Sequence, residues 1–255
     1  MITVKTPEEI KILKDGGKIL ASVLLMVAER AKPGVATLEL DERAEFLIKK
    51  AGGEPAFLNY KEKIDKYPFP ASLCVSINDE VVHGIPSRER ILKEGDIVGL
   101  DLGLKWNGFY TDATITVGVG KISEEAQKLL DTTKSALDKG IASIKENAAI
   151  GDIGCAIQSH VEKNGFNVVK KLVGHGVGYD LHEEPEIPNW GEKKTGIVLK
   201  QGMVLALEPM ATMGNGDVYL AQNNWTWKAK NGFLSAHFEH TIAVAKNGAE
   251  VLTRI

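Results

Sequence analysis

Two segments of this chain end an apolar run with a carboxylate. Residues 92–101 read LKEGDIVGLD and residues 199–208 read LKQGMVLALE, and they align without a gap at a constant offset. A carboxylate at the end of an apolar strand is costly to bury unless a cation, an ion pair or hydrogen bonds compensate its charge. The repeated pattern predicts a duplicated scaffold that directs Asp101 and Glu208 toward one central point.

Further matches flank these segments in the same order. The matching pairs are residues 82–85 with 174–177 and residues 109–117 with 236–244. The second pair adds another acid to each half, Asp112 in the first and Glu239 in the second. Because so many matches in register are not expected by chance, we predict two pseudo-repeat halves, roughly 1–120 and 121–255, packed as a single domain, 1–255.

The first two acids can be placed relative to each other from the sequence. Asn107-Gly108 stands between alternating runs, which is the strongest short signal for a two-residue hairpin turn. In that register Asp112 faces Gly103, and Asp101 shares their face of the sheet, so the two carboxylates become diagonal neighbours about 7 Å apart or less. We expect open space beside Gly103. Asp101 and Asp112 alone are equally consistent with a hydrated face of the sheet and with a cation site.

The second half favours the cation site. Glu208 and Glu239 repeat the acids, and His175 stands at a glycine-flanked strand end. Carboxylates and an imidazole form a hard, oxygen-rich set that suits divalent ions such as Mn, Fe, Co or Zn. Paired ions of this kind generate a hydroxide nucleophile near neutral pH.

Bulk properties exclude several other classes of protein. With 255 residues, a net charge of −3 and a pI near 6.1, the chain has no electrostatic basis for binding nucleic acid or an anionic membrane. No apolar run approaches the ~20 residues of a membrane span, and the N-terminus lacks the apolar region of a signal peptide. Its two cysteines, Cys74 and Cys155, are typical of a reduced compartment. We expect a cytoplasmic monomer.

Apolar periodicity distributes these groups over helices and strands. The run Thr6-Pro7-Glu8-Glu9 predicts a capped helix start, and Thr37, Ser123 and Asp152 are predicted to start three more helices. The expected helices cover residues 7–30, a stretch from 37, 123–144 and 152–164. The expected strands cover residues 72–78, 168–173, 197–207, 238–244 and 250–253.

Seven short motifs, weak singly, are specific in their order and spacing. They are residues 78–86 (NDEVVHGIP), 101–103 (DLG), 110–112 (YTD), 174–178 (GHGVG), 181–185 (LHEEP), 207–210 (LEPM) and 238–241 (FEHT). Together they resemble type I methionine aminopeptidases over nearly the whole chain. The resemblance implies that family's pita-bread fold, an α/β (α+β) architecture of two pseudo-symmetric halves around a central antiparallel sheet. It also implies two divalent metal ions (Co, Mn, Fe or Zn) held by Asp101, Asp112, His175, Glu208 and Glu239.

The resemblance assigns catalytic roles to three residues. A metal-activated water, deprotonated with help from Glu208, would attack the peptide carbonyl after the first residue. His182 would stabilise the developing oxyanion, and His83 would contact the scissile amide. Considered without the acids, His182 could be a turn residue and His83 a core histidine at a strand end.

The resemblance also implies a methionine pocket and a monovalent cation. The pocket wall would consist of Phe69, Cys74, His83, Leu181 and Trp225. Cys74 lies in an expected strand, so ordinary core packing is an equal interpretation. Asn78 and Ser235 resemble a monovalent-cation site of some relatives.

Three features depart from the type I pattern. Leu181 stands where an aromatic residue is common, and His237 often has a glutamine counterpart. Residues 61–66 (KEKIDK) lengthen the loop before Phe69. We expect these departures to alter the shape of the pocket and not the chemistry.

The resemblance implies removal of the initiator methionine from peptides and nascent proteins whose second residue is small, with transient binding to the ribosome. The alternatives are a prolidase or Xaa-Pro aminopeptidase of the same fold, and a non-catalytic peptide-binding protein. Prolidases usually carry a large N-terminal domain and a further histidine where Tyr179 stands. A non-catalytic protein would have lost metal ligands, and none is lost. The short interval between His182 and Glu208 favours type I over the longer type II enzymes.

Overall fold

The computed structural model describes residues 2–63, 65–145 and 147–254, so Ile64 of the 61–66 segment lies outside the described residues. The helices within these ranges are α1 (Pro7–Ala28), α2 (Thr37–Lys50), α3 (Glu124–Ser143), α4 (Ile150–Lys163) and the short 3₁₀ helix η1 (Lys230–Gly232). The strands of the first half are β1 (Glu54–Pro55), β2 (Leu73–Ile77), β3 (Glu80–Val82), β4 (Ile97–Trp106) and β5 (Phe109–Gly118). Those of the second half are β6 (Asn167–Val168), β7 (Val173–Gly176), β8 (Glu183–Pro188), β9 (Val204–Leu207), β10 (Met210–Thr212), β11 (Val218–Leu220), β12 (Trp227–Ala229), β13 (Ser235–His237), β14 (His240–Ala245) and β15 (Gly248–Val251).

Local capping explains where α1 and α3 begin. Thr6 and Glu9 form a capping box, in which Glu9 Oε2 accepts the Thr6 N–H at 2.7 Å, and Pro7 is the first helical residue. Ser123 Oγ accepts the N–H of Ala126 at 3.1 Å and caps α3. Both starts were predicted from the sequence.

The predicted starts of α2 and α4 were wrong by one to three residues. Ala36 and Ala149 occupy the N-cap positions, and the third helical residue, Glu39 or Asp152, accepts the alanine N–H at 2.9 Å. The hydroxyl of Thr37 instead exchanges two hydrogen bonds with the backbone of the loop before β4. Tertiary contact, and not capping, explains that threonine.

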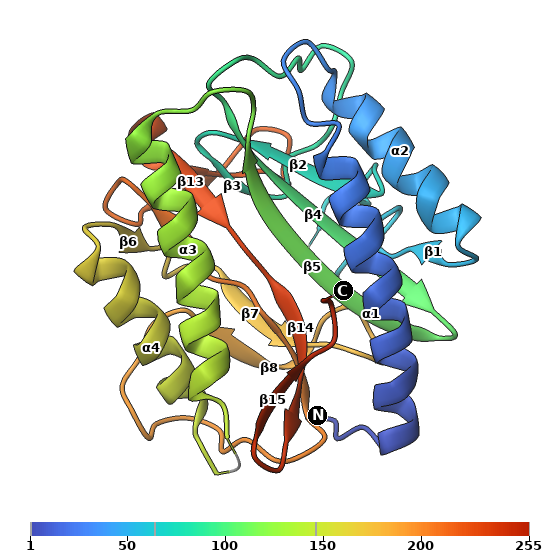
Figure 1. Cartoon of the computed structure of the whole chain (residues 1–255), viewed down its shortest axis with the longest axis vertical. Helices are drawn as coiled ribbons and strands as arrows, with labels where there is room; N and C mark the ends of the chain where they lie inside the picture. Colours follow the sequence, from blue (N-terminus) through green and yellow to red (C-terminus); the bar gives the residue numbers. More distant parts are fainter. Residues whose placement is uncertain (1, 64, 146, 255) are drawn as a thin grey trace.

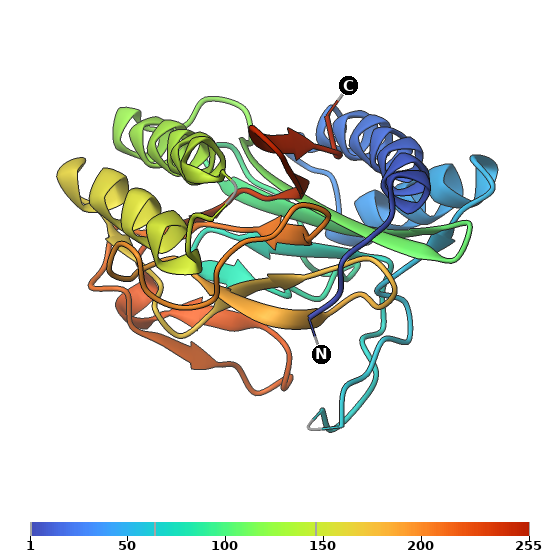
Figure 2. The ribbon, with the colours of Figure 1, turned by 90° about the horizontal axis from the view of Figure 1, so that it is seen from below.

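The strands pair antiparallel, and the two larger sheets each belong to one half of the chain. In the first, β4 has β5 on one edge and both β1 and β2 on the other. The second has the order β15-β14-β9-β7-β8. The α-helices lie on one side of these sheets, α1 and α2 by the first and α3 and α4 by the second (Figure 1 and Figure 2). The other side is left for the smaller sheets and loops.

The internal repeat extends to individual backbone hydrogen bonds. Thr37 N donates to Arg90 O at 2.8 Å, and the equivalent Ile150 N donates to Ile197 O at 2.9 Å. The same residue offset relates Arg90 to Ile197 as relates Asp101 to Glu208 (90 to 197, 101 to 208). Each half therefore fastens its second helix to the turn before its acid-bearing strand in the same way.

The β4–β5 hairpin has the predicted register. Asp112 pairs with Gly103, and Asp101 lies two residues away on β4. The expected open space opposite Asp112 is absent, because a Cβ added to Gly103 would lie 2.6 Å from Cε1 of Phe57. The Phe57 ring fills that space, so the glycine permits close packing there.

Two strand predictions in the second half were too long. Of residues 168–173, only Val168 and Val173 belong to strands, because β6 pairs with β10 whereas β7 pairs with β8 and β9. The chain changes sheets between them. Of residues 197–207, only Val204–Leu207 is strand, and Val198 makes an isolated bridge to Ala149.

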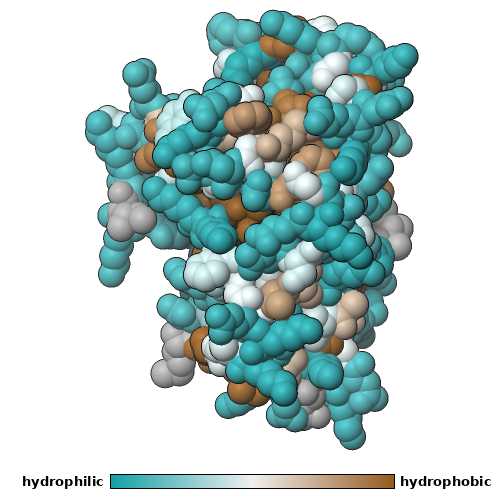
Figure 3. Space-filling model, turned by 90° about the vertical axis from the view of Figure 1, so that its left-hand side faces the viewer, coloured by the Kyte–Doolittle hydropathy of each residue, from teal (hydrophilic) through white to brown (hydrophobic). Residues whose placement is uncertain are grey.

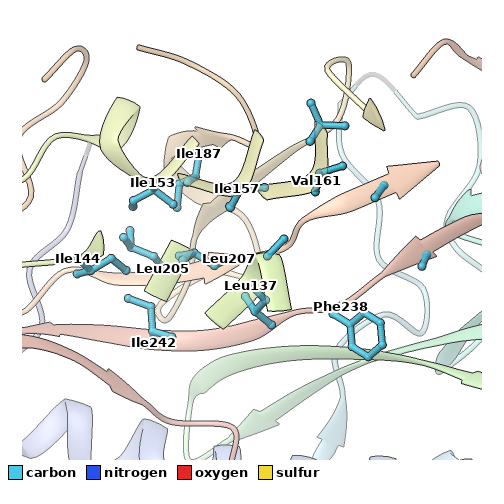
Figure 4. Close-up of a cluster of buried hydrophobic side chains, with 14 of the residues drawn as sticks. Leu137, Ile144, Ile153, Ile157, Val161, Ile187, Leu205, Leu207, Phe238 and Ile242 are labelled. Atoms are coloured by element: carbon cyan, nitrogen blue, oxygen red, sulfur yellow. The ribbon is translucent and has the colours of Figure 1, made fainter. Parts of the chain in front are cut away.

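Apolar cores fill the space between helices and sheets. In the second half, Leu137 of α3 and Ile157 of α4 pack near Leu205 of β9 and Ile242 of β14 (Figure 4). The face that carries α4 is mostly hydrophilic, with apolar side chains in groups between hydrophilic ones (Figure 3). Within the described ranges, no helix combines the length and apolarity needed to cross a bilayer.

Candidate active site

Four acids and one histidine from both halves meet at one cavity. Asp101 lies on β4, Asp112 on β5 and His175 on β7, while Glu208 directly follows β9 and Glu239 directly precedes β14. All five line a cavity of about 50 Å³. The ligand atoms of Asp112, His175 and Glu239 all lie within 4.8 Å of one another. The fold therefore brings together the five residues singled out from the sequence.

The burial of these acids identifies what the site requires. Asp101, Asp112 and Glu239 are only 8%, 4% and 2% exposed, so the hydrated sheet face is ruled out. One carboxylate oxygen of each is buried without a hydrogen-bond partner among the described residues. Buried oxygens of this kind are costly unless a cation or a donor satisfies them. Because carboxylate oxygens and imidazole are good ligands for divalent ions, the donor set fits a metal centre.

Electrostatics point in the same direction. Burial raises the pKa of Asp112, and the carboxylates of Glu239, Asp101 and Glu208 raise it further. Burial, followed by repulsion from Glu208 and Asp101, likewise raises the pKa of Glu239. A bound cation would remove this repulsion and allow the acids to remain ionised at neutral pH.

The single imidazole of the quintet presents one nitrogen to the cavity. His175 Nδ1 lies 2.9 Å from the Gly176 carbonyl, to which it donates, so Nε2 keeps its lone pair. Nε2 lies 3.5 Å from Glu208 Oε1. Burial lowers the pKa of His175 to about 3, which keeps the ring neutral and able to bind a metal.

The residues expected in the methionine pocket line the same cavity. Phe69, Cys74, His83, Leu181 and Trp225 all contribute to its wall. Phe69 and Trp225 meet edge to face at 5.2 Å between ring centroids, and His83 meets Trp225 at 6.1 Å. Cys74 is 4% exposed, and burial raises the pKa of its thiol, so it presents a neutral, soft surface.

His182 is held by two residues of the lengthened loop. Its Nδ1 lies 2.8 Å from Glu62 Oε1 and 2.7 Å from the Tyr60 hydroxyl. The hydrogen bond from His182 is the main cause that lowers the pKa of Glu62 to about 2. His182 also meets the ring of His175 edge to face at 4.3 Å between centroids. His182 therefore lies beside one of the five residues that converge on the cavity.

His237, noted as a departure from the type I pattern, is part of the site. It is 3% exposed, and its Nε2 lies 3.4 Å from Glu208 Oε2. Both its backbone groups bond to the hydroxyl of Thr116 on β5. His237 therefore places a second imidazole beside Glu208.

Asn78 and Ser235, the expected monovalent-cation residues, are neighbours in the fold. Ser235 N donates to Asn78 O at 2.8 Å, and the Ser235 hydroxyl donates to Ala211 O. The Asn78 side chain bonds to Asp96 and to the Ile97 amide. A cation there stays a prediction.

The turn that carries Leu181 and His182 is held by Lys5, which lies in the N-terminal segment before α1. Lys5 Nζ lies 2.7 Å from Glu183 Oε2, and the two side chains are 1% and 6% exposed. Glu183 Oε1 accepts the amides of Tyr179 and Asp180 at 2.5 and 3.1 Å. This buried ion pair closes the turn immediately beside His182.

Residues 11–246 match the model of metallopeptidase family M24. The chain belongs to this family. The M24 chain is 46% identical over 255 residues to the methionine aminopeptidase of Clostridium perfringens, covering 100% of both sequences. It superimposes on the crystal structure of methionine aminopeptidase from Thermotoga maritima with a TM-score of 0.96 and 42% identity, covering 100% of both chains. The resemblance inferred from the motifs is confirmed.

A more distant likeness concerns the fold alone. The prolidase of Pyrococcus horikoshii superimposes on the M24 chain with a TM-score of 0.76 at 23% identity, and the chain covers 63% of it. The pita-bread fold that the resemblance implied, and that the internal repeat fits, is confirmed. The prolidase alternative is not favoured.

Three site residues of the M24 chain were missed from the sequence: Phe57, Tyr60 and Glu62. Gly103 was at most a partial signal, since a glycine inside a strand often marks a close approach by another group, but nothing in the sequence identifies that group as Phe57. No sequence signal pairs Glu62 with His182, because the two residues lie in different halves and meet only through the fold.

Proposed function

We propose that the chain is a metalloaminopeptidase that removes N-terminal methionine from peptides and nascent proteins when the second residue is small. The observation that carries this proposal is the convergence of four acids and His175 beside an apolar, aromatic-walled cavity. The full-length similarity to methionine aminopeptidases supports it. A free amino terminus and a methionine side chain are the substrate features that such a closed site would accept.

Two divalent ions are proposed as cofactors, held by Asp101, Asp112, His175, Glu208 and Glu239. When bound, they would supply an acidified water and Lewis-acid polarisation of the scissile carbonyl. The orphaned oxygens of Asp101, Asp112 and Glu239 support this assignment. The choice among Co, Mn, Fe and Zn belongs to the proposal as well.

The side chains around the ions would then handle protons and charge. Glu208 would accept a proton from the attacking water. Burial and the charge of Asp101 raise the pKa of its carboxyl, and bound cations would counter that shift and keep the carboxylate able to accept. His182 donates to the oxygen on which negative charge develops. His83, neutral because burial lowers its pKa to about 4, contacts the scissile amide.

The cavity wall accounts for the proposed selectivity. Phe69, Cys74, Leu181 and Trp225 offer soft, polarisable contacts to a thioether side chain. The preference for a small second residue is part of the proposal, because the space beyond the scissile bond must close around that residue. We further propose that the protein is a monomer that acts in the cytoplasm. It would bind the ribosome transiently and act on the chains that emerge from it.

The test is hydrolysis of defined peptides by the purified, metal-loaded protein under reducing conditions. Cleavage of Met-Gly-Met-Met and Met-Ala peptides, with little cleavage of Xaa-Pro peptides, is expected. Protein that leaves Met-Gly-Met-Met intact defeats the proposal, and preferential cleavage of Xaa-Pro peptides would favour a prolidase. Glu208→Gln should nearly abolish turnover, since the amide cannot accept the proton.

A further inference from the structure

We propose that Glu62 is a positioning residue for His182, so that the lengthened loop of this chain completes the catalytic site. The inference rests on the proposed function, because it gives Glu62 a part in the same peptide hydrolysis. The central observation is the contact of 2.8 Å between Glu62 Oε1 and His182 Nδ1. The Tyr60 hydroxyl donates to the same Glu62 oxygen at 3.0 Å.

The chemistry of the pair determines how the imidazole is presented. An ionised carboxylate only accepts hydrogen bonds, so Nδ1 of His182 carries a proton directed at Glu62. Nε2 is then the ring nitrogen left to face the substrate. A carboxylate that holds the far nitrogen of a histidine fixes both the proton position and the orientation of the ring.

Two aromatic contacts restrict the ring further. Tyr60 meets His182 edge to face at 5.1 Å and 88°, and His175 does so at 4.3 Å and 82°. The ring packing does not select between the two ring nitrogens, and the Tyr60 hydroxyl, 2.7 Å from Nδ1, can donate or accept, whereas the Glu62 carboxylate only accepts. The hydrogen bond from Nδ1 makes that selection, and this is the task assigned to Glu62.

Backbone hydrogen bonds hold the base of the loop before Phe69 close to the pocket. Asn59 N donates to Phe69 O at 2.9 Å and Phe69 N donates to Tyr60 O at 2.8 Å, so the base of the loop is closed beside the pocket. Glu62 stands two residues from that closed base, and its own amide donates to Asp65 Oδ2 at 2.8 Å. Figure 2 shows the loop extending from the body of the protein, away from the helices. Because hydrogen bonds close the base of this long loop, the Glu62 carboxylate can be held at a fixed position beside His182.

The test compares kcat and KM of the metal-loaded protein on Met-Ala-Ser for Glu62→Ala, Glu62→Gln and Lys63→Ala. Lys63 is an exposed residue of the same loop and serves as the matched control. Carboxylates that orient a histidine in metal sites are typically worth 10–100-fold. For this half-exposed pair we expect Glu62→Ala to lower kcat about 10-fold with KM within about twofold. Glu62→Gln, which keeps an acceptor, should recover part of the loss, and Lys63→Ala should match the wild type.

The deciding measurement is the double variant with His182→Ala. If Glu62 acts only through His182, then Glu62→Ala causes no further loss in the His182→Ala background. An additional loss there, a change confined to KM, or wild-type kcat in Glu62→Ala overturns the inference while the proposed function stands. Thermal unfolding of each variant identifies a loss that comes from misfolding. A wild type that cleaves no Met-initiated peptide instead ends the proposed function, and this inference with it.

Discussion

Thr114 and Thr241 occupy equivalent positions in the two halves, and each bonds to the acid strand of the other half. Thr241 Oγ1 accepts the Asp112 N–H at 2.9 Å and donates to Asp112 O at 2.8 Å. Thr114 Oγ1 donates to Glu239 Oε2 at 2.9 Å, and its carbonyl accepts the Glu239 N–H at 2.9 Å. The two sheets are therefore joined at the residues that carry the acids, so the geometry of the site and the cohesion of the halves depend on the same contacts.

Replacing Thr241 with valine should weaken both stability and metal binding. The change leaves the buried N–H and C=O of Asp112 unsatisfied, which costs about 1–3 kcal/mol in the free energy of unfolding. Because Asp112 is then less well held, Mn²⁺ affinity should fall about 10-fold. Urea denaturation and calorimetric titration measure the two effects. Thr241→Ser keeps the hydroxyl and is the control, and equal values for the two variants would contradict the prediction.

Divalent ions should stabilise the folded protein through the acids. A cation that binds only the folded state raises the free energy of unfolding by about 2.7 kcal/mol at 100 times its Kd. Thermal unfolding of chelator-treated protein with and without Mn²⁺ should display this gain. Asp112→Asn should reduce it strongly, whereas Asp138→Asn on exposed α3 should not, since that carboxyl is 59% exposed. An undiminished gain in Asp112→Asn would remove this residue from the ligand set.

An alanine at position 103 should damage the pocket. Its Cβ would lie 2.6 Å from Phe57 Cε1 and 2.8 Å from the Cβ of Ala56, so the Phe57 ring must move. Overpacking of this kind typically costs 1–3 kcal/mol, and because Phe57 lines the cavity we expect a higher KM for Met-Ala peptides. Gly99→Ala on the same strand meets nothing closer than 3.6 Å and is the matched control. Identical kinetics for the two variants would show that Phe57 does not shape the pocket.

The buried Lys5–Glu183 pair predicts a pH-dependent contribution to stability. Burial opposes ionisation of Glu183, but hydrogen bonds from Lys5 and Thr3 outweigh it, and the pKa falls below the ordinary value of 4.5. A carboxyl whose folded-state pKa is lowered stabilises the protein above its unfolded pKa, and that stability is lost as pH falls through the folded value. Lys5→Met should therefore destabilise the protein by about 3 kcal/mol at pH 7.

The difference between Lys5→Met and the wild type should shrink as pH falls from the ordinary value of 4.5 through the lowered folded-state pKa of Glu183, because Glu183 then takes up a proton in the wild type as well. Urea denaturation between pH 7 and pH 3.5 checks this. The double variant Lys5→Met with Glu183→Gln, which leaves no unpaired charge, should recover part of the stability at pH 7. A difference independent of pH would mean that Lys5 acts by packing and not by charge.

Interactions between residues near in sequence were predictable. The Asn107-Gly108 turn set the register that places Asp101 and Asp112 on one face, and Thr6 and Ser123 capped their helices as expected. The internal repeat also indicated the two pseudo-symmetric halves. Turn type and capping depend on the conformation of a few adjacent residues, which is why a linear pattern records them.

Contacts between distant segments were not written in any such pattern. Thr37 looked like a cap but bonds to a distant loop, and Gly103 looked like open space but receives the Phe57 ring. Glu62 of the first half contacts His182 of the second half at the end of the loop that precedes Phe69. The turn that carries His182 is itself held by the Lys5–Glu183 ion pair. The residue types predicted metal chemistry, because several buried carboxylates need a compensating charge and a divalent cation supplies it. The side chains that hold the site residues in place could not be predicted in this way. They come from the opposite half of the chain, and only the packing between the halves brings residues over a hundred positions apart into contact.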